Sequence, residues 1–290
     1  MILDPSKIST SEVQLFLQHI VAPRPIGLVS SINKAGQVNL SPFSFFNLFS
    51  SNPPIVIFSP ARRVRDNTQK HTLENVLEVP EVVINMVSYD MVQQTSLAST
   101  EYHRGINEFT KAGLTEEKAQ IVKAPMVKES KAKLECNVIE IKELGKKGGA
   151  GNLVICEVLM IHIQNEVLDA EGHPNPSKLQ QVARLGGDWY TKVNDQSLFM
   201  VPKPNKHIGM GIDALPAYIR NSEVFTGNDL AQLANATSIP EIDHNFTNED
   251  LTIRLDTENK ADKSQLHRLA KKYLSHQDLE TAWQLLLREK

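Results

Sequence analysis

The four consecutive residues Arg65-Asp66-Asn67-Thr68 offer a cation, a carboxylate and a hydroxyl where a helix is expected to begin. Free N–H groups at a helix N-terminus, and the positive end of the helix dipole, attract anions such as phosphate. Arg65 would add a fixed charge with planar donors, the Thr68 hydroxyl would donate a hydrogen bond, and Asp66 would cap the helix. Taken alone, the four residues favour the simpler interpretation of a capped helix beside a solvated arginine.

The loop before this segment changes that balance, because it combines small polar side chains with aromatic ones. Serine and asparagine suit the hydroxyls of a polyol and the polar edge of a flat ring, whereas aromatic side chains suit the faces of the ring. Core packing would account for at least half of the phenylalanines, and turn formation for the serines. An anion site behind such a loop is complementary to flavin mononucleotide (FMN), which has a flat ring, a polyol and a phosphate. The side chains are Ser41, Ser44, Asn47, Ser50, Ser51 and Ser59, with Phe43, Phe45, Phe46, Phe49 and Phe58.

The composition argues against several other classes of function. The 290 residues include 31 basic and 34 acidic side chains, a net charge of −3, whereas nucleic-acid binders usually show a basic excess. No run approaches the roughly 18 apolar residues of a membrane-spanning helix, and the first residues lack the features of a signal peptide, so we expect a cytoplasmic protein with no membrane partner. The nine histidines lack ligand spacing, so we expect no metal site.

Two cysteines and one glycine cluster have simple structural interpretations. Cys136 and Cys156 lie in strand-like runs without a CxxC partner, which predicts buried, reduced thiols. The cluster Gly148-Gly149-Ala150-Gly151 lies between two predicted strands and does not open a helix. It therefore predicts a flexible hairpin tip and not a dinucleotide-binding loop.

The pattern of the first 200 residues predicts many strands and few helices. Runs rich in Val and Ile, bounded by Gly, Pro and Asn, predict the strands, and the turn Asn33–Gly36 predicts a hairpin of the first two. A helix capped by Ser9 or Thr10 would start the chain with Val13, Phe16, Leu17 and Ile20 on one face. This order favours a closed antiparallel barrel decorated with helices over a regular βαβ series. The strands are expected at 26–32, 37–41, 54–59, 82–88, 133–143 and 152–164, and short helices at 67–78, 90–98 and after Asn175-Pro176.

The two longest strands have distinct patterns. In 133–143 the apolar alternation changes phase between Val138 and Ile139, which predicts a bulge at a barrel corner. The run 152–164 is apolar almost throughout, which predicts a central strand buried on both faces.

The sequence changes character after about residue 200. Pro202 and Pro204 mark a connector, and helical patterns follow at 214–221, 227–237, 262–275 and 276–289. The last two patterns are amphipathic and their charges nearly cancel, which predicts a packed helical appendage. We therefore divide the chain into a barrel domain (1–200) and a mostly helical C-terminal extension (201–290).

Several segments, in order, resemble the flavin reductase-like, FMN-binding split-barrel family. The resemblance begins with RPIGLVSSINKAGQVNLSPFSFFNLFSSNPPIVIFSPA, continues to RDNT, and covers roughly residues 20–235. It includes a C-terminal extension seen in one branch, similar to the flavoredoxins. The later segments are VVINMV (82–87), STEYHRGINEFTKAGLT (99–115), VKESKAKLEC (127–136), NLVICEV (152–158), RLGGDWY (184–190) and HIGMGIDALPAYIRNSEVFTGNDLAQLAN (207–235).

The resemblance implies a mainly β, Greek-key split β-barrel with added helices, forming a homodimer with FMN near the subunit interface. It implies that Arg65 and Thr68 meet the phosphate, with Ser59 or Ser50 nearby. The ring and ribityl chain would lie along Phe43, Ser44, Phe45 and Asn47. A loop around Tyr102, His103, Asn107 and Phe109 would close over the ring. Arg24 opens the first strand at a matching position, but the sequence does not assign its contact.

The chain departs from this family at one position that bears on activity. Shorter flavin reductases often carry Gly-Asp-His before the strand matched here by NLVICEV, whereas this chain has Gly149-Ala150-Gly151-Asn152. His162 lies inside the following strand and is expected to be structural, and His103 is a possible substitute. We expect an oxidoreductase that reduces FMN with NAD(P)H and passes electrons to a further acceptor, with no side chain assigned as catalytic. The alternatives are a flavin-binding electron-transfer module reduced by a partner protein, and an interaction scaffold without flavin.

Overall fold

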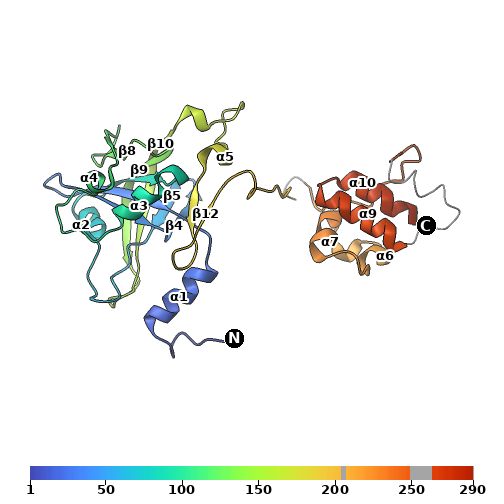
Figure 1. Cartoon of the computed structure of the whole chain (residues 1–290), viewed down its shortest axis with the longest axis horizontal. Helices are drawn as coiled ribbons and strands as arrows, with labels where there is room; N and C mark the ends of the chain where they lie inside the picture. Colours follow the sequence, from blue (N-terminus) through green and yellow to red (C-terminus); the bar gives the residue numbers. More distant parts are fainter. Residues whose placement is uncertain (204–206, 249–262, 290) are drawn as a thin grey trace. The chain divides into compact units, whose positions relative to one another are not determined.

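The computed structural model describes residues 1–203, 207–248 and 263–289. The chain forms two compact units, Met1–Phe199 and Met200–Lys290, each with its own hydrophobic core (Figure 1). The first unit is mainly β and the second is helical. No helix in these described ranges combines the length and the hydropathy needed to cross a lipid bilayer.

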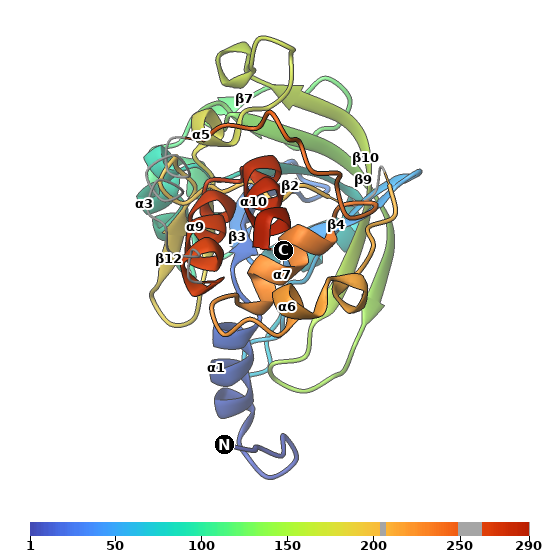
Figure 2. The ribbon, with the colours of Figure 1, turned by 90° about the vertical axis from the view of Figure 1, so that its right-hand side faces the viewer.

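A seven-stranded antiparallel sheet, in the order β3-β2-β6-β9-β10-β5-β4, forms the barrel of the first unit. Figure 2 shows the strong curvature of β9 and β10, which bend around the interior. The predicted split β-barrel with added helices is confirmed. The strands are β2 (Gly27–Ile32), β3 (Val38–Phe43), β4 (Phe46–Ser51), β5 (Pro54–Phe58), β6 (Glu81–Met86), β9 (Ala132–Glu143) and β10 (Asn152–Ile163).

Alternate side chains of these strands fill two separate cores. In β2, Val29 packs into the barrel interior, whereas the neighbouring Leu28 packs on the opposite face with Phe109. The interior also buries both thiols and receives Leu73 from a helix. The thiols are reduced, as predicted, and burial raises the pKa of Cys156 to about 12.

Two predictions about the strands were wrong and one is confirmed. The serine- and phenylalanine-rich segment is not a loop throughout, because residues 46–51 form edge strand β4 against β5. Strand β10 is long but not buried on both faces, since Leu159 and Ile161 are exposed. The bulge is present: Ile155 pairs with Glu140 and Cys156 with Val138, so Ile139 is the extra residue. An apolar run does not reveal which of its faces meets solvent.

The helices of the first unit cover the barrel and its ends. Helix α1 has the predicted Ser9 cap, whose hydroxyl accepts the Glu12 N–H in a capping box, but none of its residues is buried. Asn175 caps α5, with Pro176 at its first position, as expected. The elements are α1 (Thr10–Ile20), α2 (His71–Glu78), η1 (Tyr89–Met91), α3 (Val92–Ala98), α4 (Glu108–Ala112), η2 (Asn165–Val167) and α5 (Pro176–Leu179). Two small sheets add β1 (Arg24–Pro25), β11 (Val182–Arg184) and β12 (Tyr190–Lys192), and β7 (Glu116–Glu117) with β8 (Met126–Val127).

Arg24 joins the end of α1 to the three-stranded sheet. One guanidinium nitrogen, Nη1, donates to the carbonyls of Gln18 and Val21, each at 2.6 Å, and Nη2 donates to the Leu185 carbonyl at 2.8 Å. The last carbonyls of a helix have no partner within it, so a cation at this position satisfies them. The structure thus gives Arg24 a role in the fold that the sequence had left open.

The second unit packs its helices around Trp283, which is almost completely buried. Every residue of this core lies between Leu215 and Leu287. The helical patterns predicted from the sequence are present, although residue 262 lies outside the described residues. The elements are η4 (Ile212–Ala214), α6 (Ala217–Arg220), α7 (Gly227–Ala234), α9 (Lys263–Ser275), α10 (Leu279–Leu286) and η5 (Leu287–Glu289).

Candidate functional site

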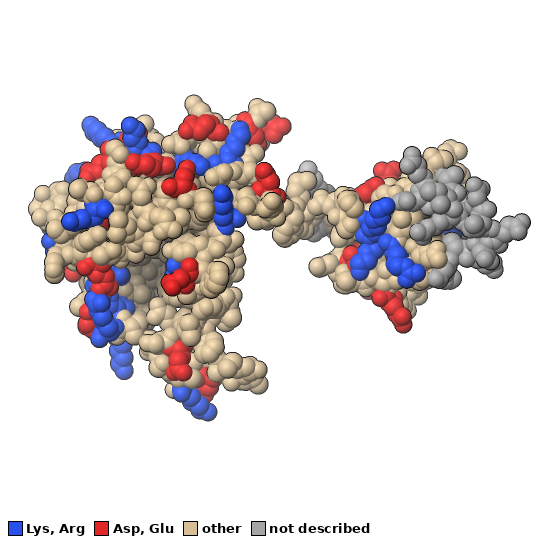
Figure 3. All heavy atoms as spheres, viewed as in Figure 1, with Lys and Arg blue, Asp and Glu red and all other residues tan. Residues whose placement is uncertain are grey.

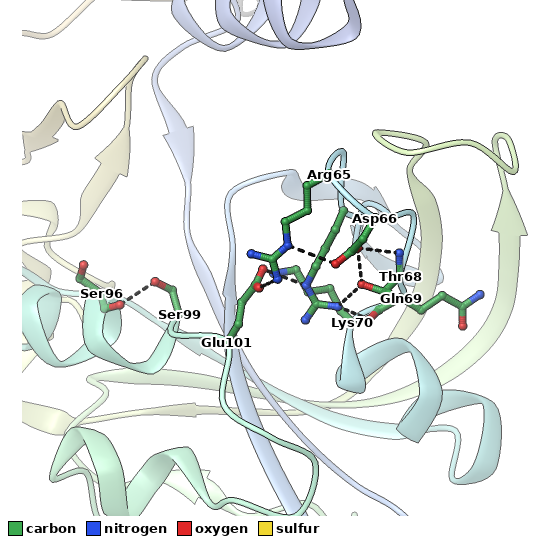
Figure 4. Close-up of polar contacts among 9 residues, drawn as sticks. Arg65, Asp66, Thr68, Gln69, Lys70, Ser96, Ser99 and Glu101 are labelled. Carbon is green, nitrogen blue, oxygen red and sulfur yellow. Dashed lines mark hydrogen bonds and ion pairs between the residues drawn. The ribbon is translucent and has the colours of Figure 1, made fainter.

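Three cationic side chains, Arg63, Arg65 and Lys70, converge on the carboxylate of Glu101 (Figure 4). We call these three residues the cationic cluster. The Arg63 Nε atom lies 2.8 Å from Oε1 of Glu101, the Lys70 Nζ atom lies 3.9 Å from the same oxygen, and Arg65 bonds the other oxygen. Arg65 also pairs with Asp66 at 3.1 Å. Three positive and two negative charges leave one positive charge in excess, as an anion site requires.

The segment that carries the cluster folds back on itself before α2 begins. The Arg63 guanidinium donates to the Thr68 hydroxyl at 2.8 Å and to the Gln69 carbonyl at 2.6 Å. The backbone N–H of Arg63 donates to the Thr68 carbonyl at 3.0 Å, and Asn67 adopts a positive φ of 60° that closes the turn. These bonds hold Arg63 and Thr68 together without a helix.

The prediction that a helix begins at Asn67 was therefore wrong. Helix α2 begins at His71, after Lys70, so Arg65 and Thr68 precede it in a tight turn. Asp66 is not a helix cap: its Oδ1 accepts the Thr68 hydroxyl at 2.7 Å and the Thr68 N–H at 3.0 Å. Those two hydrogen bonds, with that from Arg65, lower the pKa of Asp66 to about 2. The local Asp–Thr bonds compete successfully with helix formation.

The glycine-rich hairpin between β9 and β10 is hydrogen-bonded to the backbone just before this turn. The Arg62 N–H donates to the Ala150 carbonyl at 2.8 Å, and the Gly149 N–H donates to the Arg62 carbonyl at 2.9 Å. A Cβ atom on Gly148 would lie only 2.8 Å from the Val64 carbonyl oxygen. The hairpin was predicted, but it is hydrogen-bonded to residues 62–65, which we call the arginine segment, so its tip is not free.

A cleft opens beside the cationic cluster and is lined mainly by polar side chains. Burial lowers the pKa of Lys70, and the nearby Arg63 lowers it further. At the other side, burial raises the pKa of Glu108, whose carboxylate accepts the Leu40 N–H at 2.9 Å. The lining residues are Asn39, Ser41, Arg63, Lys70, His71, Thr72, Ala98, Ser99, Thr100, Glu101, Tyr102 and Glu108.

The loop 99–107 forms one wall of this cleft and is tied to α2. Arg104 pairs with Glu74 at 2.6 Å and with Glu78 at 3.2 Å. A second cleft lies between the loop and α2 and shares Asn39 and His71 with the first. The loop therefore approaches the cluster through Glu101 and approaches α2 through Arg104.

The predicted loop residues have differing positions in the structure. Tyr102 lines the cleft, and His103 lies beside it on the exposed turn. Asn107 caps α4, its side chain accepting the Phe109 N–H at 2.9 Å and donating to Glu116 at 2.6 Å. Phe109 is 1% exposed in the core behind the loop.

The other predicted cofactor-binding residues lie outside the lining of the cleft. Phe43 is 7% exposed and packs in the barrel interior against Phe58, with ring centroids 5.2 Å apart. Ser44 and Phe45 lie between β3 and β4, Asn47 and Ser50 lie on β4, and Ser59 follows β5, with its N–H donating to the Phe45 carbonyl at 2.8 Å. Thr68 bonds Arg63, which does line the cleft, and Arg65 shares the Glu101 carboxylate with Arg63.

Several residues that line the cleft were not predicted from the sequence. Arg63 stands beside Arg62 and Arg65 in the sequence, so nothing in the pattern marks it as the most enclosed arginine of the cluster. Lys70 could have been found from its position immediately before the first turn of α2. Glu101 is more than 30 residues away, and only the tertiary fold brings it to the cluster.

His162 has the structural role that was predicted. Its Nε2 atom lies 2.7 Å from Oε1 of Glu135, a fully buried carboxylate that also accepts the N–H groups of residues 120–122. This pair fixes a surface segment to β9 and β10.

Over the visible face, both signs of charge are interspersed on each unit (Figure 3).

Comparisons with known proteins match the first unit. The model of the family described as "Flavin reductase like domain" matches residues 20–178. An uncharacterized protein of Aquifex aeolicus is 39% identical over 174 residues, which cover 60% of this chain and 86% of that protein.

Solved structures agree with the fold. Component B of the nitrilotriacetate monooxygenase from Bacillus cereus is similar, with a TM-score of 0.64 and 25% identity over 69% of this chain and 98% of that one. The flavoredoxin of Desulfovibrio vulgaris has a similar fold, with a TM-score of 0.52 and 21% identity over 62% of this chain and 90% of that one.

Proposed function

The chain belongs to the flavin reductase-like domain family, and on that premise we propose that its first unit binds FMN and passes electrons from NAD(P)H to a further acceptor. The observation that carries this proposal is the cationic cluster at the edge of a polar cleft. The phosphate of FMN would pair with the cationic cluster, and its polyol would hydrogen-bond with the hydroxyl and amide groups of the cleft. When bound, FMN would supply the capacity to accept a hydride.

The residues present fit the phosphate group of FMN. Arg63 and Arg65 offer planar, charged donors, Lys70 offers a point charge, and the Thr68 hydroxyl lies within the same turn. A single subunit therefore supplies the polar part of the site.

In this proposal the chain's own residues bind and orient the flavin and stabilise the charge that develops on it. Asn39, Ser41 and Thr72 line the cleft, as does Tyr102. The Thr72 hydroxyl donates to Asn39 at 2.7 Å and the Asn39 amide donates to Glu108 at 2.8 Å, so these bonds fix the polar lining. Hydride transfer to a flavin depends chiefly on ring alignment and on donors near the developing negative charge. We assign no side chain as a proton donor.

We also propose that a second copy of the chain completes the site. Phe45, Leu48 and Phe49 are exposed on and beside edge strand β4, and Leu17 and Ile20 are exposed on α1. Exposed apolar side chains gathered on an edge strand are typical of an interface. In a homodimer, Phe45, Ser44, Asn47 and the loop at His103 would meet the flavin ring as the family resemblance implies.

A second candidate is a flavin-binding electron-transfer module that a partner protein reduces. The hairpin Gly149–Asn152 favours it, because the hairpin carries no histidine and its backbone is engaged by Arg62. The name of the similar Bacillus cereus protein, a component of a monooxygenase, supports the enzymatic proposal instead, with the acceptor in an oxygenase system.

The absorption spectrum of the freshly purified protein is the first test. A flavin band near 450 nm, or its appearance after FMN is added, is expected. Anaerobic stopped-flow mixing of the FMN-loaded protein with NADH or NADPH should then bleach this band rapidly. Bleaching only by a reduced ferredoxin-like donor would favour the electron-transfer module, and a colourless protein that does not bind FMN would leave only an interaction scaffold.

A further inference from the structure

The Glu101 carboxylate occupies the position that an anionic ligand of the cationic cluster would take. Its Oε1 atom is 2.8 Å from Arg63 Nε and 3.9 Å from Lys70 Nζ, and its Oε2 atom is bonded by Arg65. One carboxylate thus engages all three cations at once. These contacts lower the pKa of Glu101, the hydrogen bond from Arg63 being the largest cause.

The position of Glu101 in the fold allows its carboxylate to leave. It lies in the loop 99–107, between the end of α3 and the start of α4, in a stretch with neither helix nor strand. Its side chain is 35% exposed, whereas that of Arg63 is 14% exposed. Arg63 is fixed by Thr68 and Gln69, so the cation stays in place if the carboxylate moves.

A phosphate monoester is a stronger partner for the same three cations. A carboxylate brings one negative charge and two oxygens, whereas a terminal phosphate brings about −1.5 to −2 charges and three acceptor oxygens. A monoester can therefore displace the carboxylate, whereas a small monoanion compensates less for the lost ion pairs and an uncharged ligand leaves the carboxylate in place. The site discriminates between anions because only an anion that binds the three cations more strongly than Glu101 does can displace its carboxylate.

We propose that Glu101 is a built-in competing anion that partly neutralises the cationic cluster and favours ligands with a terminal phosphate monoester over small monoanions. This inference rests on the proposed function, because it takes the cluster as the phosphate site of FMN. Glu101 is then a specificity-determining residue: it weakens binding of every anion and weakens small monoanions most.

The test compares wild-type full-length protein, freed of flavin, with Glu101→Gln, which keeps the size of the side chain and removes its charge. Affinities for FMN and riboflavin are measured by flavin fluorescence, and affinity for inorganic phosphate by calorimetry. We expect Glu101→Gln to bind FMN and inorganic phosphate at least about fivefold more tightly, because a charge-assisted competitor is lost. Riboflavin affinity should not change.

Two matched variants control for other effects of the substitution. Glu140→Gln removes one charge from an exposed position on β9 and controls for net charge. Glu74→Gln removes a partner of Arg104 and controls for loosening of the loop 99–107. Neither variant should change FMN or phosphate affinity by more than about twofold.

The outcomes separate this inference from the proposed function. Unchanged or weaker FMN and phosphate binding by Glu101→Gln would overturn the role of Glu101 and leave FMN binding by the wild type intact. If neither protein binds FMN but Glu101→Gln binds phosphate more tightly than wild type, the competing anion stands and the proposed function falls. Failure of both proteins to bind either ligand would overturn both.

Discussion

Lys70 is the cation of the cluster whose charge depends most on its surroundings. Burial and the positive Arg63 lower its pKa, while Glu101 acts in the opposite direction. A half-buried ammonium beside two guanidinium groups is held in place by anions, whether the carboxylate of the protein or the phosphate of a ligand. Replacing Lys70 should therefore weaken ligand binding more than replacing the exposed Arg65.

Lys70→Met should weaken FMN binding by about 1.5–3 kcal/mol, because a hydrogen bond between charged groups is lost in a partly enclosed site. Lys70→Arg, which keeps the charge, should retain most of the affinity. Arg65, whose side chain is 69% exposed, should matter less when replaced by alanine. Flavin fluorescence titration gives all three values, and an affinity of Lys70→Met equal to wild type would remove Lys70 from the site.

The two thiols should be unreactive in the folded protein. Burial raises the pKa of Cys156 to about 12 and raises that of Cys136 as well, so neither forms a thiolate near pH 8. Ellman's reagent should therefore react slowly at pH 8 and rapidly once guanidinium unfolds the chain and restores a pKa near ~8.5. Rapid reaction of the native protein would contradict the buried placement of both side chains.

At the residue scale the sequence predicted an anion site but missed most of the residues that line the cleft. Arg65 and Thr68 could be predicted from a short motif, because residues close in the sequence stay close after folding. Glu101, Asn39 and Glu108 were not, because they reach the cleft from elements that only the sheet and its helices bring together. The expected helix start also failed, since Asp66 bonds Thr68 locally and delays α2 until His71.

The β9–β10 hairpin and the arginine segment act as one element, although more than 80 residues separate them. Backbone hydrogen bonds join Arg62 to Gly149 and Ala150, and Gly148 lies against the backbone of Val64. Strands such as β9 could be predicted with their bulge, because alternation of apolar residues records which face is buried. The contact at the hairpin tip could not, since glycine has no side chain to signal what it touches.

Gly148→Ala should destabilise the protein by about 1–3 kcal/mol and weaken FMN binding. The added Cβ would lie 2.8–2.9 Å from two carbonyl oxygens, so the hairpin or the arginine segment must shift. Gly227→Ala is the matched control, because nothing lies within 4 Å of its Cβ position. Urea unfolding and flavin titration measure the two effects, and wild-type values for Gly148→Ala would show that the hairpin does not support the site.

Arg24→Ala should also destabilise the first unit, by about 1–3 kcal/mol, because the carbonyls of Gln18, Val21 and Leu185 lose a charged donor. Arg24→Lys should restore part of the loss, since a lysine can reach only some of these carbonyls. FMN affinity should change little in either variant. A stability equal to wild type in urea unfolding would show that solvent replaces the guanidinium at no cost.

At the scale of the whole chain, the second unit has a core separate from those of the first unit, which implies two folding units. Among the described residues, the buried core of the second unit lies between Leu215 and Leu287, with Met210 packed against it, and the family match ends at residue 178. A cut at residue 240 would divide the second core, whereas a cut after Phe199 follows the boundary between the units.

A chain ending at Phe199 should fold and bind FMN within about twofold of the full-length affinity. The expectation follows from the complete barrel core and the complete cationic cluster in residues 1–199. Circular dichroism, flavin titration and sedimentation check fold, binding and assembly together. Loss of FMN binding in a folded, truncated protein would mean that the second unit contributes to the pocket or to the dimer.

The sealed sulfur atoms of the barrel affect how electrons could travel through such a protein. Thiols that do not ionise at physiological pH form no disulfide and donate no electrons, so the interior contains no rival redox couple in these two side chains. For a flavin held as proposed, every reducing equivalent would leave by way of the surface. The efficiency of coupling to the acceptor would then depend on what docks at that surface.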